Sequence, residues 1–169
     1  ALSLFFLGGC EQFKKVLGLH QGEPKGVEPC PEGLTQTLKQ DEQKGGWSST
    51  CLDAQGVKQG PQSTWHNNTE KESLIEFKDG KPHGQAKSWY WNGQLKSQAQ
   101  NKDGKAHGKA FRWYENGQKQ IELEVKMGVQ HGPRTIWNEQ GQKIEEGSFQ
   151  TGKKHGPWTR WDDNGQKVQ

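Results

Sequence analysis

The amino-acid sequence predicts an all-β fold built from tandem 24-residue β-hairpin repeats. The first observation is a His-Gly pair that recurs every 24 residues from His83 to His155, and a fixed period of this size is typical of repeat architectures. The second is a set of Asn-Gly and Asp-Gly dipeptides, which favour tight hairpin turns. The third is an alternation of apolar and polar residues between those turns, which is the pattern of a β-strand.

The N-terminal residues are typical of an export signal rather than of the sheet. Residues 1–9 are apolar or small but too few to cross a bilayer as a helix, which needs about 20 residues, so we interpret them as a signal-peptide remnant. Leu7-Gly8-Gly9-Cys10 resembles the bacterial lipobox, which implies lipidation of Cys10. A buried strand that ends at a chance cysteine is the alternative. Residues 10–29 contain prolines and glycines without a sustained period, and we expect them to form a lipidated flexible tether.

The lipobox resemblance implies a protein that is lipid-anchored in the bacterial cell envelope. Glu11 after the cysteine is similar to the sorting pattern of outer-membrane lipoproteins, so we expect an outer-membrane anchor, with the domain facing the periplasm or the surface. In that oxidising compartment Cys30 and Cys51 are expected to form a disulfide across the first edge of the sheet, contributing about 3 kcal/mol. Two free thiols are the alternative. Zinc is disfavoured because no Cys-x-x-Cys or closely spaced histidine accompanies them.

The repeat domain is expected to span residues 30–169, with an N-terminal cap over 30–55 and repeats over 56–169. A weaker copy, with Gln59 in place of the histidine, precedes four full copies. Each full copy carries a His-Gly pair, a tryptophan and the glycine of a Gly-Gln pair: His83, Gly84, Trp89 and Gly93; His107, Gly108, Trp113 and Gly117; His131, Gly132, Trp137 and Gly141; His155, Gly156, Trp161 and Gly165.

The segments between the turns are expected to be strands with one apolar side. Ile121, Leu123 and Val125 would point to one face, while Glu122 and Glu124 point to the other. Helices are disfavoured because each interior glycine costs a helix about 1 kcal/mol and glycine recurs throughout the repeats.

The repeated word resembles the variant form of the MORN repeat, found in a bacterial family often labelled YwqK-type antitoxin. Gly104 to Gln118 matches its motif nearly letter for letter, and the resemblance covers residues 46–169. It implies consecutive hairpins paired side by side in an elongated antiparallel sheet, without catalytic machinery, that serves as a scaffold or partner-binding module. The third full copy departs from the motif, with Asn138 in place of the tyrosine and Gln140 before the glycine.

The histidine and tryptophan columns are interpreted as structural. Equivalent residues of successive hairpins lie about 9.5 Å apart, whereas nitrogens bound to one zinc ion lie within about 4 Å of each other. The histidines are therefore expected to bond turn backbone beside the following glycine rather than to bind a metal. The tryptophans are expected to supply core in a sheet poor in other large apolar residues, with a ligand platform as the alternative.

No catalytic motif is present, and no cofactor or metal is expected. The net charge of +3, from 23 basic and 20 acidic residues, is too mild to indicate nucleic acid. Lysines gather at the turns that lie next to the His-Gly pairs, here called the histidine-side turns. This basic rim either keeps the domain soluble or binds an anionic partner. It consists of Lys78, Lys81, Lys102, Lys105, Lys126, Lys153 and Lys154.

We therefore expect a monomeric, non-enzymatic, membrane-anchored scaffold that binds a protein or anionic envelope material. An antitoxin or immunity-type protein that neutralises a toxin is the alternative implied by the family resemblance. A hydrolase acting on an envelope polymer is a third hypothesis, without a motif to support it.

Overall fold

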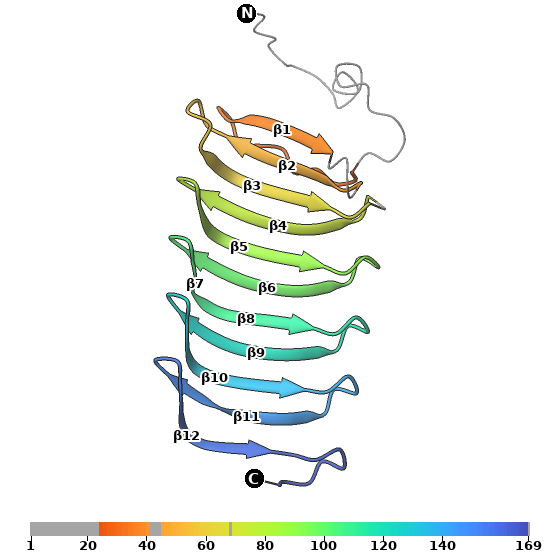
Figure 1. Cartoon of the computed structure of the whole chain (residues 1–169), viewed down its shortest axis with the longest axis vertical. Helices are drawn as coiled ribbons and strands as arrows, with labels where there is room; N and C mark the ends of the chain where they lie inside the picture. The colour runs from red at the N-terminus through yellow and green to blue at the C-terminus, as the bar shows by residue number, and fades with distance from the viewer. Residues whose placement is uncertain (1–23, 41–44, 68, 169) are drawn as a thin grey trace, which may run out of the picture.

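The computed structural model describes residues 24–40, 45–67 and 69–168, which form one antiparallel sheet (Figure 1). The strands follow one another across the sheet in chain order, each pairing with the next, and the short β7 pairs with β6 beside β8. They are β1 (Thr35–Gln40), β2 (Trp47–Leu52), β3 (Lys58–Trp65), β4 (Lys71–Lys78), β5 (Lys81–Trp89), β6 (Leu95–Lys102), β7 (Lys105–Ala106), β8 (Gly108–Trp113), β9 (Lys119–Lys126), β10 (Val129–Trp137), β11 (Lys143–Gln150) and β12 (Lys153–Arg160). The predicted all-β hairpin-repeat fold is confirmed.

The turns at the histidine-side edge have two central residues, both with positive φ. In the β4–β5 turn Lys78 pairs with Lys81, and Asp79 and Gly80 have φ values of 51° and 73°. This conformation matches the twist of the flanking strands and favours an Asp-Gly sequence. In later repeats the first position is Met127 or Thr151, at φ values of 51° and 49°. These two turns therefore keep the geometry with side chains that favour it less.

The turns at the opposite edge are longer; in the full copies only their glycine has positive φ, whereas in the β3–β4 turn Thr69 has a φ of 68°. In the β5–β6 connection the Gly93 amide donates to Tyr90 O (2.9 Å) and the Tyr90 amide donates to Gln94 O (2.8 Å). Asn92 does not itself adopt positive φ; its Oδ1 accepts a hydrogen bond from the Gln94 amide at 3.0 Å. Asparagine thus shapes this loop through its side chain.

The register separates the tryptophans from the aliphatic side chains. Phe111 pairs with Glu122 and Ala110 pairs with Leu123, and residues directly opposite in an antiparallel pair share a face. One side, the tryptophan face, carries Trp47, Trp65, Trp89, Trp113, Trp137 and Trp161 together with lysines and glutamates. The other side, the aliphatic face, carries Ile75, Phe77, Ile121, Leu123, Val125 and Phe149.

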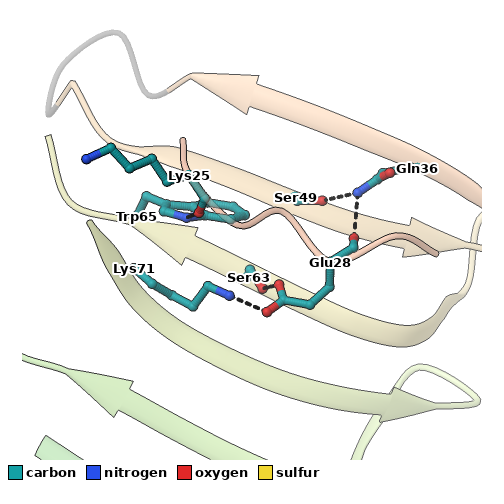
Figure 2. Close-up of polar contacts among 7 residues, drawn as sticks. All are labelled: Lys25, Glu28, Gln36, Ser49, Ser63, Trp65 and Lys71. Carbon is teal, nitrogen blue, oxygen red and sulfur yellow. Dashed lines mark hydrogen bonds and ion pairs between the residues drawn. The ribbon is translucent and has the colours of Figure 1, made fainter. Parts of the chain in front are cut away.

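Burial is concentrated at the N-terminal end of the sheet. Among the described residues the core comprises Trp47, Cys51 and Trp65, with Ser49 and Ser63 buried beside them. Trp65 is 1% exposed, whereas the tryptophans of the four full copies are only half-buried. The reason is architectural: the segment that contains Lys25 and Glu28 lies over Trp65 and Ser63 on the tryptophan face (Figure 2).

Candidate binding surface

The basic rim is exposed along one edge of the sheet, at the successive turns that follow β4, β6, β9 and β11 (Figure 1). All seven predicted lysines, from Lys78 to Lys154, lie at these turns. The first two of the turns also contain Asp79 and Asp103, which partly neutralise the lysines beside them. The last two contain Met127 and Thr151 at the equivalent positions, so the C-terminal half of the rim is the more strongly basic.

The first histidine of the column contacts the next repeat rather than its own turn. His83 Nδ1 lies 3.5 Å from the Asp103 amide nitrogen and 3.4 Å from Asp103 Oδ1. Gln59, one repeat earlier, makes the same link, because its amide donates to Asp79 Oδ1 at 2.8 Å and accepts from the Asp79 amide at 3.1 Å. Gln59 and His83 thus connect successive turns, which differs from the expected bond beside the following glycine, whereas His107 Nδ1 is buried without a hydrogen-bond partner.

The tyrosines after the tryptophans form a second link between repeats. Tyr90 Oη donates to Trp113 O at 2.8 Å, and Tyr114 Oη donates to Trp137 O at 3.0 Å. Asn138, which replaces the tyrosine in the third full copy, instead accepts hydrogen bonds from backbone amides of its own loop. The link is therefore made by the first two full copies and not by the third.

A column of lysines lies between the aromatic rings of the tryptophan face. The Lys71 ammonium lies 5.9 Å from the ring centroid of Trp65 and 6.0 Å from that of Trp89. Lys119 lies 5.3 Å from the centroids of both Phe111 and Trp137. Cation–π contacts of this kind are worth about 0.5–1 kcal/mol at exposed sites. The lysines thus fill the spaces between neighbouring rings of this face.

Each of these lysines is paired with a carboxylate. Lys119 Nζ lies 2.8 Å from Glu122 Oε2, and Lys143 makes the same pair with Glu146 three residues further on. The equivalent position after Lys71 is Leu74, which has no charge. Glu28, from the segment before the sheet, supplies the missing carboxylate and forms an ion pair with Lys71 (Figure 2).

Residues 24–31, the N-terminal clasp, are fixed across β2 to β4 by further contacts (Figure 2). The indole Nε1 of Trp65 donates to Lys25 O at 2.8 Å. Ser63 Oγ donates to Glu28 Oε2 at 2.7 Å, and Gln36 Nε2 donates to Glu28 O at 2.9 Å. The clasp therefore binds through side chains of the sheet, and both its backbone and its acidic group are recognised.

A disulfide and a close approach to a glycine also hold the clasp against the sheet. The predicted disulfide is confirmed, with Cys30 and Cys51 joined and their Cα atoms 5.6 Å apart. A Cβ added at Gly60 would lie 3.1 Å from Pro31 Cδ, so glycine allows the clasp to approach the strand closely. Residues 24–29, predicted to be tether, thus belong to the packed structure. Cys10 and the rest of the predicted tether lie outside the described residues.

The lysine contacts lower the pKa of two glutamates. For Glu28, partial burial raises the pKa, but hydrogen bonds from Lys71 and Ser63 outweigh this effect and the net shift is downward. For Glu122, the hydrogen bond from Lys119 lowers the pKa most, and Lys109 lowers it further. Both carboxylates are therefore stabilised in their charged form by the face on which they lie.

Metal and membrane-spanning features are absent from the parts of the chain that the structure describes. Within residues 24–40, 45–67 and 69–168, no three His, Cys, Asp or Glu side chains gather as metal ligands would. The same ranges contain no helix long and apolar enough to cross a membrane.

These features define a single-layer β-hairpin repeat protein, in which neighbouring hairpins are linked by side chains and the strands present a repeated surface. The family model for the MORN repeat variant matches residues 82–103 and 106–127, so two adjacent hairpins of this chain are MORN-variant repeats. No curated protein matches the chain. MORN-variant repeats are a known non-catalytic repeat architecture, and the two matched hairpins suggest a repeat scaffold.

Proposed function

We propose that the protein is a non-enzymatic scaffold of the bacterial cell envelope that binds a protein or anionic envelope partner. The observation that carries this proposal is the repeated surface of lysines and tryptophans, held in register by the His83–Asp103 and Tyr90–Trp113 links. Such links favour a fixed array of side chains over a single deep site, and an array of this kind suits an extended partner.

The scaffold proposal is tested by chemical crosslinking in native envelopes, followed by affinity capture and mass spectrometry. A partner that recurs with the wild-type protein and survives stringent washing supports a scaffold. Release of soluble fragments from purified cell-wall polymer by the protein alone would contradict the non-enzymatic assignment. Recovery of a toxin whose activity the protein abolishes would instead favour the antitoxin function, for which the family resemblance is the support.

In this proposal Cys10 carries the lipid that attaches the scaffold to the membrane. The support is the lipobox-like sequence Leu7-Gly8-Gly9-Cys10 together with the Cys30–Cys51 disulfide, a bond that is typical of exported proteins. The test is metabolic labelling with palmitate and fractionation of wild-type and Cys10→Ser proteins. Label in the wild type, with the variant released to the soluble exported fraction, is expected. An unlabelled wild-type protein would refute the anchor.

The basic rim is the proposed contact for anionic material. Near a negatively charged membrane surface each lysine contributes about 1 kcal/mol, and salt screens this attraction. The unlipidated domain should therefore co-sediment with anionic vesicles at low salt and dissociate at high salt. The Lys102→Gln, Lys105→Gln, Lys126→Gln triple variant should bind less. Binding that ignores both salt and these substitutions would exclude the rim.

A further inference from the structure

The N-terminal clasp shows how the tryptophan face holds an extended peptide. The clasp crosses β2 to β4 with one backbone carbonyl on the Trp65 indole and its Glu28 carboxylate between Ser63 and Lys71. These contacts come from side chains on the surface of the sheet, so any repeat with equivalent side chains could bind a segment in the same way.

The next repeat carries a modified version of the same surface. Trp89 occupies the position of Trp65, Lys87 that of Ser63 and Leu95 that of Lys71. Pairing of Lys87 with Gln98, and of Trp89 with Leu95, places these four side chains together on the tryptophan face. We call this group of four residues the Lys87 window. The window thus keeps a cation near the position that the Glu28 carboxylate takes in the clasp site. In the clasp site this cation is Lys71 on β4, whereas in the window it is Lys87 on β5, the counterpart of β3.

The Lys87 window differs from the later repeats in lacking its own acid. Lys119 and Lys143 are paired with Glu122 and Glu146, whereas Gln98 stands at the equivalent position in the window. Within the described part of the chain, Lys87 takes part in no ion pair and the Trp89 indole N–H has no hydrogen-bond partner. A cation and an N–H donor on one half-buried surface complement a carboxylate and a backbone carbonyl.

We propose that the Lys87 window binds an extended acidic peptide segment of a partner protein, oriented across β5 and β6 as the clasp lies across β2 to β4. The acidic side chain of the partner contacts Lys87, and a backbone carbonyl accepts a hydrogen bond from the Trp89 indole. Leu95 and the ring of Trp89 contact the apolar part of the segment. The window is continuous with the clasp surface, and the inference rests on the scaffold function proposed above.

The probe is a synthetic peptide with the sequence of residues 24–31 in which Cys30 is replaced by serine. It is titrated into the full chain with the disulfide intact, while the indole N–H signals of the tryptophans are followed by NMR. Saturable movement of the Trp89 signal is expected, while the Trp65 signal, already bonded to the clasp, stays in place. Replacing the peptide glutamate by glutamine, or Lys87→Gln in the protein, should weaken binding about tenfold, as expected for loss of one charge-assisted hydrogen bond.

Lys109→Gln is the matched control, because Lys109 lies on the same face but is already paired with Glu122 at 3.3 Å. This variant should bind the peptide as the wild type does. No movement of the Trp89 signal at millimolar peptide, equal binding by the glutamate and glutamine peptides, or movement of Trp65 in place of Trp89 would each overturn the proposal. If the peptide fails while a crosslinked envelope partner is still recovered, the scaffold function stands and only the window is refuted.

Discussion

Glu28 contacts Lys71, a residue 43 positions away, and fills the site that Glu122 fills for Lys119 within a single strand. The first repeat lacks its own carboxylate because Leu74 occupies the position. The clasp is therefore part of the ion-pair pattern of the repeats, and its contribution can be separated from the rest of the fold by restoring the missing acid.

The Leu74→Glu substitution should make Glu28 partly redundant. Glu28→Gln in the wild type is expected to reduce the free energy of unfolding by about 1–2 kcal/mol, because it removes a charged hydrogen-bond partner from half-buried Lys71. In the Leu74→Glu background the same change should have a smaller effect, since the new carboxylate reaches Lys71. Urea unfolding of the four proteins gives this coupling energy, and equal effects in both backgrounds would contradict the proposed equivalence.

Acid should destabilise the protein through Glu28 and Glu122. Both have a lowered pKa in the folded state, so their stabilising contribution is present above the ordinary glutamate pKa and is lost as the pH falls through the lowered values. Unfolding measured between neutral pH and about pH 3 should show stability decreasing below about pH 4.5. The Glu28→Gln, Glu122→Gln double variant should show a shallower decrease; an identical profile would rule out these two groups as its source.

The glycines of the His-Gly pairs should differ in their tolerance of alanine. Gly84 and Gly108 have similar φ values of 96° and 90°, but a Cβ at Gly84 would collide with the Glu76 carboxylate, whereas one at Gly108 meets no atom within 4 Å. Glu76 Oε2 accepts the Gln85 amide at 2.7 Å, and displacing it breaks that bond. Gly84→Ala should therefore lower the free energy of unfolding by about 1 kcal/mol more than Gly108→Ala does. Thermal unfolding of both variants tests this ranking.

Trp65→Ala should destabilise the protein more than Trp113→Ala. Trp65 is 1% exposed and bonded to the clasp, so its removal leaves a cavity and is expected to cost about 3–5 kcal/mol. Trp113 is half-buried and packs on Phe111, with ring centroids 5.7 Å apart, so its loss should cost less. The denaturant midpoints of the two variants would rank their losses of stability. A larger loss for Trp113→Ala would show that burial does not determine how much each tryptophan contributes to stability.

The repeat period, the hairpins and the Cys30–Cys51 bridge were predictable because each depends on local sequence or on residue chemistry. Which side chains share a face of the sheet was harder to predict from the sequence. Trp113 and Ile121 are both odd-numbered, yet a register shift at Trp113 places them on opposite sides, and a one-residue shift reverses the face of every following side chain. The predicted core role of the tryptophans accordingly differs between the covered and uncovered repeats.

The clasp and the lysine column were missed for different reasons. Lys71, Lys119 and Lys143 recur at multiples of 24 residues, with Leu95 as the exception, and this spacing is visible in the sequence. Glu28 has no counterpart in any repeat, so no periodicity points to it. Its contacts with Ser63 and Lys71 span 35 and 43 residues and depend on how the preceding segment crosses the sheet.

Because the clasp covers the first strands, the two ends of the sheet are expected to unfold in a fixed order. β2 alternates buried and half-buried residues beneath a disulfide-fastened cover, whereas most of β12 is exposed and is followed by the isolated bridge of Trp161 with Lys167. In a chain of units that touch only their neighbours, the least buried units open first and opening spreads from them. Amide protection against deuterium should therefore decline from the first strands toward the last, and a partner bound near the C-terminal end would have the greatest effect on how long the sheet stays closed.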